Sequence, residues 1–282
     1  MLAAALMRNL TLALMLTVGL LAVSCNNLQY DVNVELPTNP PQLVVECYLE
    51  PDSVYRLYLT QTTGFLAPAN QVPVVPNATV TITYQGNLIP LAFYPPGSPG
   101  NKLVFGEYRS TQIVPRDYTT PFFLNISTPD GKRVTGTTTI QRPIPKLDTL
   151  AVFWNRRDAQ IQIAWQKPDT LNFNYYRVVY DTFKPDSVFT FIRSDELRVG
   201  AKQDFTFTPF RYKEKDTVAV RLYRVNRQYF DWYRSVSASI QANQNPFAQA
   251  GRILSNVNGG IGIFTGMAEL RKGVRIPAPP PQ

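Results

Sequence analysis

Hydrophobic and polar residues alternate with a period of two along most of this 282-residue chain. Such alternation places every second side chain on one face of an extended strand, so it indicates strands with one buried face. Proline and glycine separate the alternating segments at short intervals, and many short strands divided by turns are typical of a β-sandwich. The first group of expected strands covers 43–50, 54–61, 78–86 and 121–140, the last with a Pro-Asp-Gly hairpin turn at 129–131.

A second group of strands is expected after the segment RPIPKLD (142–148), whose alternate prolines predict a stiff extended linker. Within this group, Trp165, Lys167-Pro168 and Tyr175-Tyr176 resemble a fibronectin type III domain, in which such aromatic residues pack between two sheets. A carbohydrate-binding platform built from the same aromatic residues is the alternative, and core packing is favoured. These strands are expected at 149–155, 159–168, 173–181, 186–192, 203–210 and 216–225.

One segment, 226–244, has the periodicity of an amphipathic helix instead of a strand. Its apolar side chains recur at spacings of three and four residues, which places them on one helical face: Tyr229, Trp232, Tyr233, Val236 and Ile240. We expect a helix near 227–241, capped by Asn226, that lies across the second sandwich and buries this face. A helix that docks a partner protein is the alternative.

These elements predict a mainly β protein with two immunoglobulin- or fibronectin-III-like β-sandwich domains and one helix in the C-terminal region. The first domain is expected at 43–141 and the second at 149–275. The glycine-rich segment NVNGGIGIFTG (256–266) is expected to form a tight turn and a strand that closes the second sandwich. The proline-rich residues 276–282 are expected to form an extended tail.

The chain begins with an apolar segment that stops at a cysteine. Residues 10–23 carry no charge, and Arg8 is the only charged residue before them. As a helix the segment would rise about 21 Å, which is less than the ~30 Å hydrocarbon core of a membrane. A short apolar run after a cationic start is typical of an export signal. Translation could start at Met1 or at Met7.

The residues Leu21-Ala22-Val23-Ser24-Cys25 resemble a bacterial lipobox, with alanine three places before the cysteine where leucine is usual. They predict a lipoprotein signal peptide at 1–24, cleavage between Ser24 and Cys25, and a diacylglycerol on the Cys25 thiol. Stable anchoring needs more than one acyl chain, and an acylated N-terminal cysteine meets this condition. An ordinary signal peptide followed by an unrelated cysteine is the alternative. The proline-containing residues 25–42 predict an extended tether.

The sequence contains no histidine. Ser-His-Asp and Cys-His nucleophiles, histidine acid-base catalysis and zinc sites with imidazole ligands are therefore excluded. No calcium loop, phosphate-binding glycine loop or GxSxG motif occurs either. We expect no catalytic residue, no metal site and no cofactor, and the ligand stays unknown. An enzyme that uses paired carboxylates, such as a glycan hydrolase, is the alternative. Four aspartates next to turn-forming residues are explained by turn formation: Asp52, Asp130, Asp169 and Asp186.

The second cysteine, Cys47, is expected to be a small buried side chain, because acylation of Cys25 leaves it without a disulfide partner. The chain has a net charge of +8, and its basic excess lies in residues 101–282, which hold 26 basic and 15 acidic residues, whereas residues 26–100 hold one base and five acids. A basic excess can indicate nucleic-acid binding, but the lipid anchor and the absence of a binding motif argue against it. Attraction to lipopolysaccharide or to an acidic partner, and a plain solvated surface, are the alternatives that remain.

Several segments in a fixed order resemble a family of Bacteroidota outer-membrane lipoproteins, domain-of-unknown-function family 4249. They are Leu43–Glu46, Ala78–Gly86, Gly106–Tyr108 and Asn245–Phe264, together with the lipobox. Cys47 stands where glycine is common in the family. The resemblance implies a gene beside a TonB-dependent receptor and a role as that receptor's lipoprotein partner. It implies no catalytic residues.

The leading hypothesis is a non-enzymatic outer-membrane lipoprotein, anchored by lipidated Cys25, that captures substrate for a TonB-dependent receptor in nutrient uptake. A structural or adhesive cell-surface module is the alternative. Whether the protein faces the periplasm or the cell exterior stays open.

Overall fold

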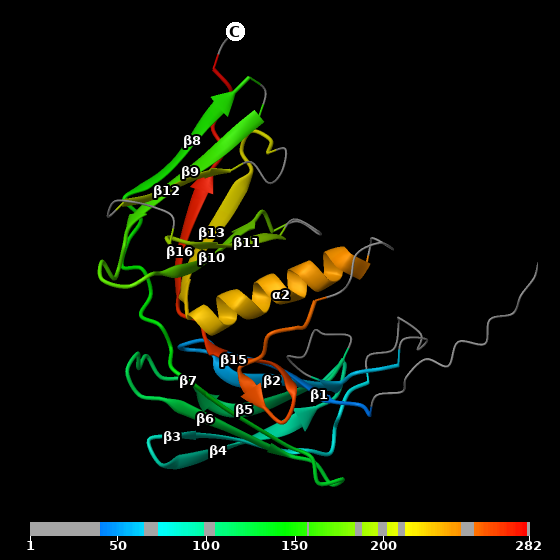
Figure 1. Ribbon diagram of the computed structural model, residues 1–282. Helices are drawn as coiled ribbons and strands as arrows, with labels where there is room; N and C mark the ends of the chain where they lie inside the picture. Colours follow the sequence, from blue (N-terminus) through cyan, green and yellow to red (C-terminus); the bar gives the residue numbers. More distant parts are fainter. Residues whose placement is uncertain are drawn as a thin grey trace, which may run out of the picture. The chain divides into compact units, whose positions relative to one another are not determined.

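A computed structural model describes residues 40–64, 73–98, 105–156, 158–183, 188–196, 202–207, 212–243 and 251–280. The chain from Pro40 to Gln282 groups into one compact unit. Its described residues form three β-sheets and helix α2 (Arg227–Asn243) (Figure 1). The predicted mainly β architecture with sandwich-like sheets and one helix is confirmed. None of the helices in the described ranges has the length and apolarity needed to cross a membrane.

The largest sheet has nine strands in the order β14-β7-β6-β3-β4-β5-β2-β1-β15. They are β1 (Leu43–Leu49), β2 (Val54–Gln61), β3 (Thr79–Tyr84), β4 (Asn87–Tyr94), β5 (Glu107–Ile113), β6 (Phe122–Ser127), β7 (Arg133–Thr138), β14 (Val257–Asn258) and β15 (Ile261–Gly266). The predicted strands at 43–50, 54–61 and 78–86 and the predicted hairpin at 121–140 are all present. Strands β4 and β5 were not predicted.

Strand β4 joins the two halves of this sheet. Its first part, Asn87–Leu91, pairs with β3, and its last part, Ala92–Tyr94, pairs with β5. Because the strand changes partners along its length, the sheet turns over itself and both halves share one core. Alternate residues of β1 and β6 are buried in that core. Burial of each large apolar side chain stabilises the fold by about 1.5–3 kcal/mol.

The other two sheets pack against each other around a second core. One has the order β11-β10-β13-β16 and the other β12-β9-β8. Trp165 and Tyr176 are fully buried in this core, with their ring centroids 5.1 Å apart in an edge-to-face arrangement. The predicted packing role of these aromatic residues is confirmed. The strands are β8 (Thr149–Asn155), β9 (Asp158–Gln166), β10 (Tyr175–Asp181), β11 (Val188–Ser194), β12 (Lys202–Phe207), β13 (Thr217–Val225) and β16 (Glu269–Arg275).

The glycine-rich strand β15 lies in a different sheet from the one expected. It pairs in parallel with β1, and β14 pairs with β7, so both complete the nine-stranded sheet rather than the second sandwich. Segment 257–266 therefore belongs with the strands of 43–138, and only β16 returns to the four-stranded sheet. Parallel pairing between segments far apart in sequence leaves no signal in local alternation. The strand β16 was also not predicted.

Close backbone approach explains the glycines of β15. Gly262 has φ 131°, and a Cβ atom there would overlap the carbonyl oxygen of Val45 on β1. The outer edge of β15 is bonded by side chains instead of a further strand. Asn256 accepts the Phe264 N–H at 2.8 Å and donates to the Phe264 carbonyl at 2.8 Å. Ser255 likewise accepts the Gly262 N–H at 3.0 Å, so this edge has bonded backbone groups.

Helix α2 begins as predicted, because the Asn226 side chain accepts the Tyr229 N–H at 2.8 Å. Its position differs from the prediction, which placed it across the second sandwich alone. It packs between the nine-stranded and the four-stranded sheets, and contacts β15, β10 and β11 (Figure 1). Ile240, expected in the buried stripe, is 55% exposed. The buried helix residues Tyr229, Phe230 and Trp232 form a third cluster with Tyr48, Tyr175, Val179, Tyr223, Ile263 and Met267.

The segments expected as linker and tail contain no strand or helix among the described residues. Ile144 of the predicted linker 142–148 is buried in the second core. Ile276, the first residue of the predicted tail 276–282, is also buried, and its N–H donates to the Asp216 carbonyl at 2.8 Å. Ile276 therefore belongs to the folded unit and not to a tail.

We predict that Gly262→Ala lowers the free energy of unfolding by more than about 3 kcal/mol, because the new methyl group would meet the Val45 carbonyl and the φ angle would be strained. Urea unfolding monitored by circular dichroism measures the loss. Gly273→Ala on β16 is the matched control, since open space surrounds that position, and a change within about 0.5 kcal/mol is expected. Equal stability of the two variants would contradict the close approach of β15 to β1.

Candidate functional site

The residues predicted for lipid attachment, Ser24 and Cys25, lie outside the described residues, as does Asn245-Pro246-Phe247. Cys47 is buried as predicted and is a free thiol. Its Sγ lies 3.2 Å from the Arg56 carbonyl oxygen. Burial raises the pKa of the thiol, so the reactive thiolate is disfavoured. Cys47 thus fills space in the core and is unsuited to nucleophilic chemistry.

The turn roles predicted for three aspartates are confirmed, and Asp186 lies outside the described residues. Asp52 has φ 65° in the β1–β2 turn. Asp130 lies in the β6–β7 turn, where hydrogen bonding from Thr128 lowers the pKa of its carboxyl. Asp169 accepts the N–H groups of Leu171 at 2.9 Å and Asn172 at 3.1 Å. The Asp130 and Asp169 carboxylates hold their own turns, whereas Asp52 serves its turn through its backbone conformation.

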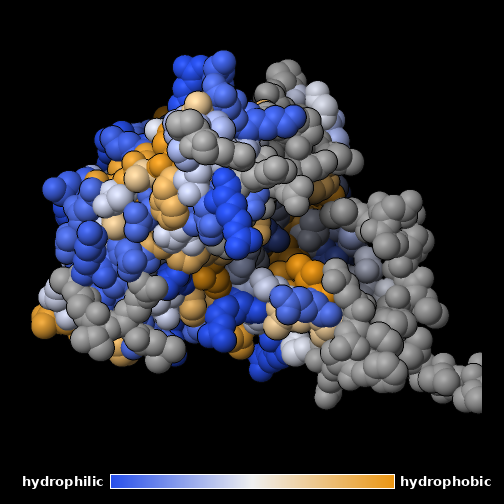
Figure 2. Space-filling view, turned by 90° about the horizontal axis from the view of Figure 1, so that it is seen from above, coloured by the Kyte–Doolittle hydropathy of each residue, from blue (hydrophilic) through white to orange (hydrophobic). Residues whose placement is uncertain are grey.

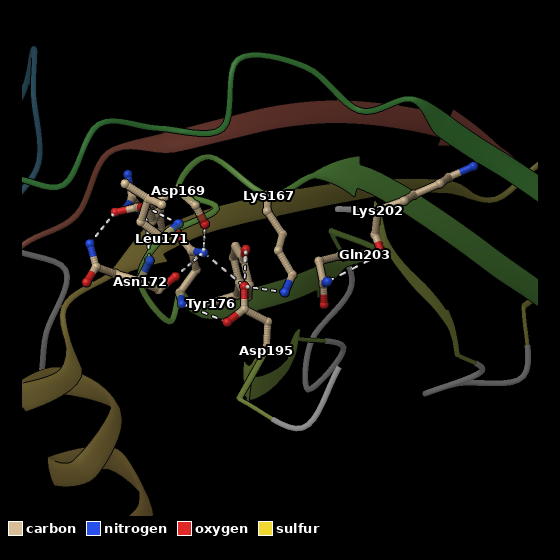
Figure 3. A network of polar contacts seen from close by, with 10 residues as sticks. Lys167, Asp169, Leu171, Asn172, Tyr176, Asp195, Lys202 and Gln203 are labelled. Atoms are coloured by element: carbon tan, nitrogen blue, oxygen red, sulfur yellow. Dashed lines mark hydrogen bonds and ion pairs between the residues drawn. The ribbon is translucent and has the colours of Figure 1, made fainter. Parts of the chain in front are cut away.

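A polar network around Asp195 is buried at one end of the second sandwich (Figure 3). Asp195 is 2% exposed and accepts the Asn174 N–H at 2.8 Å and the Asn174 Nδ2 at 2.9 Å. The Lys167 ammonium lies 3.7 Å from the same carboxylate, and the Tyr176 hydroxyl 3.5 Å. These contacts join the end of β9 to the start of β10 and the residue after β11. The network therefore fixes three elements to one another, a structural role.

A groove of about 510 Å³ opens at the junction between the sheets. The turn after β1, the loop after β5 and the strands β13 and β16 form its walls. The Met267 N–H donates to the Leu49 carbonyl at 2.9 Å, which brings the start of β16 beside the end of β1. Its charged and aromatic lining residues include Glu50, Arg116, Arg221, Tyr223, Glu269 and Arg271.

One wall of the groove is the outer face of the four-stranded sheet. In the β13–β16 register, Tyr223 lies opposite Glu269, and Arg221 lies opposite Arg271. The Tyr223 hydroxyl donates to Glu269 Oε2 at 2.9 Å. The residues share one face because their side chains follow the period of two along each strand. Sheet geometry thus places a carboxylate and two guanidiniums side by side.

The two arginines of this wall have different partners. Arg221 Nη2 lies 3.3 Å from Asp181 Oδ2 on β10. Arg271 forms no ion pair within the described residues, and its guanidinium lies 5.8 Å from the Phe183 ring centroid. Two like charges directly opposite each other on neighbouring strands repel each other. This pair therefore leaves positive charge available to an anionic group in the groove.

The opposite wall carries Glu50, directly after β1. Withdrawal from bulk water and the Glu269 carboxylate raise the pKa of Glu50, while Arg177, Arg221 and Arg56 act in the opposite direction. The Glu50 side chain makes no hydrogen bond or ion pair in the described part of the chain. A smaller cavity of about 220 Å³, lined by Tyr48, Arg56 and Tyr58, shares Glu50 with the groove.

At the rim of the groove, Arg116 and Asp52 neutralise each other. Arg116 Nε donates to Asp52 Oδ2 at 2.7 Å, and its Nη2 lies 2.6 Å from the same oxygen. This hydrogen bonding lowers the pKa of the Asp52 carboxyl. Both side chains are exposed, with 71% and 58% of their surface accessible. The two charges at the rim thus neutralise each other, and the charges left to meet a ligand are those of Glu50, Glu269 and Arg271, which are also exposed to solvent.

The arrangement suits reversible binding of a polar, charged molecule. Among the described residues, no group of three or more His, Cys, Asp or Glu side chains could hold a metal ion. The sequence analysis missed this groove, because β16 was not predicted as a strand and the local pattern did not single out Glu50. The alternation of Glu269 and Arg271 around Leu270 is the signal that could have indicated a strand with a charged face.

The surface seen from above Figure 1 is mostly hydrophilic, with hydrophobic residues in smaller groups between charged ones (Figure 2). Exposed apolar side chains among the described residues include Leu171, which is 92% exposed, and Leu88, which is 63% exposed. Leu88 lies on β4, whereas Leu171 lies in the loop between β9 and β10. Single exposed apolar residues of this kind are normal on a protein surface and define no site by themselves.

The family model described as domain of unknown function DUF4249 matches residues 29–273, so the chain belongs to this family. This confirms the family resemblance, while the Bacteroidota origin and the pairing with a receptor stay predictions. None of the curated proteins matches the sequence.

Three solved structures show weak likeness to the chain. The FN1–FN3 domains of chicken CNTN1 are 11% identical with a TM-score of 0.25, over 86% of this chain and 67% of that one. A DUF4785 family protein of Legionella pneumophila is 13% identical with a TM-score of 0.24, over 64% of this chain and 52% of that one. The chicken interferon gamma receptor alpha chain is 12% identical with a TM-score of 0.21, over 66% of this chain and 89% of that one. At such scores the likenesses support no functional argument.

We predict that Asp195→Ala lowers the free energy of unfolding by about 3–5 kcal/mol, because it leaves the mostly buried Lys167 ammonium and the Asn174 N–H without this acceptor. Thermal or urea unfolding measures the loss. Lys146→Ala breaks the exposed Lys146–Asp148 pair, 3.9 Å apart, and serves as control with an expected loss below about 1 kcal/mol. A loss for Asp195→Ala no larger than the control would show that the network is dispensable.

We predict that Glu50→Gln is more stable than the wild type at pH 7. A carboxyl whose pKa is raised on folding binds its proton more tightly when folded, so its ionisation lowers stability as pH rises. The advantage of the glutamine variant should shrink when the pH falls through the ordinary glutamate range, where Glu50 becomes neutral. Melting temperatures from pH 3 to 8 test this.

Glu214→Gln, at a surface site outside the groove, is the matched control for removing one negative charge from a basic protein. A Glu50→Gln variant that is less stable than wild type at pH 7 would mean that the attraction between the Glu50 carboxylate and the nearby arginines exceeds the cost of removing that carboxylate from water.

Proposed function

We propose that this protein is an accessory outer-membrane lipoprotein that captures a nutrient for a TonB-dependent receptor and performs no catalysis. The observation that carries the proposal is the order of parts along the chain. A lipobox that ends at Cys25 is followed by a proline-containing tether and then by a compact β unit with a charged groove. A capture protein needs a membrane anchor, then a flexible segment that lets it move away from the membrane, and then a binding surface.

The length of the tether is consistent with this role. Residues 25–42, if extended, span up to about 60 Å. A unit on such a tether stays at high effective concentration near receptors in the same membrane while it moves freely. Lipidation restricts the search for a receptor to two dimensions, so weak contacts between the two proteins suffice.

Two further observations support a capture role without catalysis. The histidine-free sequence removes the commonest catalytic acid and base. The described groove offers charged groups on rigid strands, which suits a reversible binding site. The family resemblance adds the expectation of a neighbouring TonB-dependent receptor gene.

A structural or adhesive surface module is the second candidate. Helix α2 packs against two sheets at once, which would make the β unit a stiff spacer. An adhesin must be exposed on the cell exterior, whereas an accessory protein can work on either face of the membrane. Protection from protease on intact cells would exclude the adhesin, because only an exterior protein is cleaved, whereas cleavage is compatible with both roles.

We predict that the tagged full chain, purified from detergent-solubilised membranes, brings a TonB-dependent receptor with it in near-equal amount. Mass spectrometry of the purified sample identifies and quantifies the partner. Cys25→Ser is the matched control, since it cannot be acylated and should leave the membrane fraction. Recovery of the lipoprotein alone in mild detergent, combined with cleavage on intact cells, would replace the proposal with the adhesive role.

A further inference from the structure

The groove contains two pairs of like charges, which a ligand of mixed charge would satisfy together. Glu50 and Glu269 form the acidic pair, one from each wall. Arg221 and Arg271 form the basic pair on the sheet face. Each pair is unfavourable by itself, because like charges close together raise each other's electrostatic energy. A ligand with a cationic end and an anionic end would relieve both.

One member of each pair lies on strand β16. Glu269 and Arg271 are two residues apart on β16, so their Cα atoms lie about 6.8 Å apart on the same face. A free amino acid is shorter than this spacing, because its ammonium and carboxylate flank a single Cα. A dipeptide spans at most about 7 Å and a tripeptide about 10 Å between its ends. The spacing of the charges therefore fits a short peptide better than a single amino acid.

The existing partners of the four charges leave room for such a ligand. Glu269 is held by the Tyr223 hydroxyl at 2.9 Å, which fixes its position without neutralising its charge. Arg221 is held by Asp181 at 3.3 Å through Nη2, and Arg271 is held by no carboxylate in the described residues. The groove volume of about 510 Å³ lies within the ~300–1,000 Å³ range of small-molecule sites.

We propose that this groove binds short peptides with free ends, with the peptide ammonium at Glu50 and Glu269 and the peptide carboxylate at Arg221 and Arg271. Tyr118, which lines the same groove and is partly exposed, offers apolar surface to a peptide side chain. The contacts use only the ends of the peptide and its length, so recognition would be largely independent of sequence. This inference rests on the proposed capture function and names its cargo as short peptides.

The test is isothermal titration of the full chain, purified in detergent, with Ala-Ala-Ala as the probe. Two further probes are N-acetyl-Ala-Ala-Ala and Ala-Ala-Ala-amide, each of which lacks one terminal charge. We expect the unmodified peptide to bind and each capped peptide to bind at least about tenfold more weakly, since each loses one charge-assisted contact. Equal binding of free and capped peptides would overturn the proposal, as would no binding of the free peptide at millimolar concentration.

Variants assign each end of the peptide to its site. Glu269→Gln and Arg271→Gln should each weaken Ala-Ala-Ala binding about tenfold or more. Acetylation should cost less further affinity in Glu269→Gln, and amidation should cost less in Arg271→Gln. Lys272→Gln is the matched control, because Lys272 lies opposite Val220 in the register and so projects to the other face of β16. Weakening by Lys272→Gln as large as by Arg271→Gln would overturn the assignment to this face.

The outcome separates this inference from the proposed function. Failure of peptide binding together with recovery of a TonB-dependent receptor would overturn the peptide site and leave the accessory role. Peptide binding without a receptor would leave the site and overturn the accessory role. Binding of maltose or Ca²⁺ with loss in Glu269→Gln, in place of peptide, would assign the groove to another ligand class and overturn the proposal.

Discussion

Strand β15 pairs in parallel with β1, and the rest of the structure depends on this pairing. It brings a segment near the C-terminus into the sheet built by the first part of the chain. Gly262 permits the contact, because any larger residue there would meet the Val45 carbonyl. Helix α2 then lies against Ile263 and Tyr48 on one side and against β10 on the other. The two halves of the described unit are thus held by one shared apolar cluster, not only by the linker 142–148.

The groove is a direct consequence of that pairing. The chain leaves β15 at Gly266, and after Met267 and Ala268 it enters β16 in the four-stranded sheet. The crossing places the outer face of this sheet against the end of β1, where Glu50 lies. A β-sheet face that borders solvent tolerates charged residues, and here the end of β1 in the nine-stranded sheet borders part of that face. The charged residues therefore line an open groove, in which Glu269 and Arg271 stay exposed to solvent.

The proposed anchor and tether depend on short segments of the sequence, whereas the groove depends on the tertiary structure. The proposed lipid site needs only the short segment around Cys25, because processing enzymes read a linear pattern. The proposed ligand site needs residues from four separate segments in register. The buried Asp195 network has a third role, because it keeps the end of the second sandwich fixed while the groove on the other side of the sheet stays open to solvent. A rigid sheet behind the groove preserves the spacing of its charges.

Local pattern determined the strands, the helix start and the core aromatic residues. Strands such as Thr149–Asn155 and Thr217–Val225 follow from alternation and β-branched residues, and Asn226 caps the helix through its own neighbours. The predicted turn aspartates and buried Cys47 also depend on short-range chemistry and burial. Tertiary structure alone decided that β15 joins β1, that α2 lies between two sheets, and that Glu50 meets Glu269. These contacts join segments far apart in sequence, and their free energy comes from surfaces that exist only after the sheets have formed.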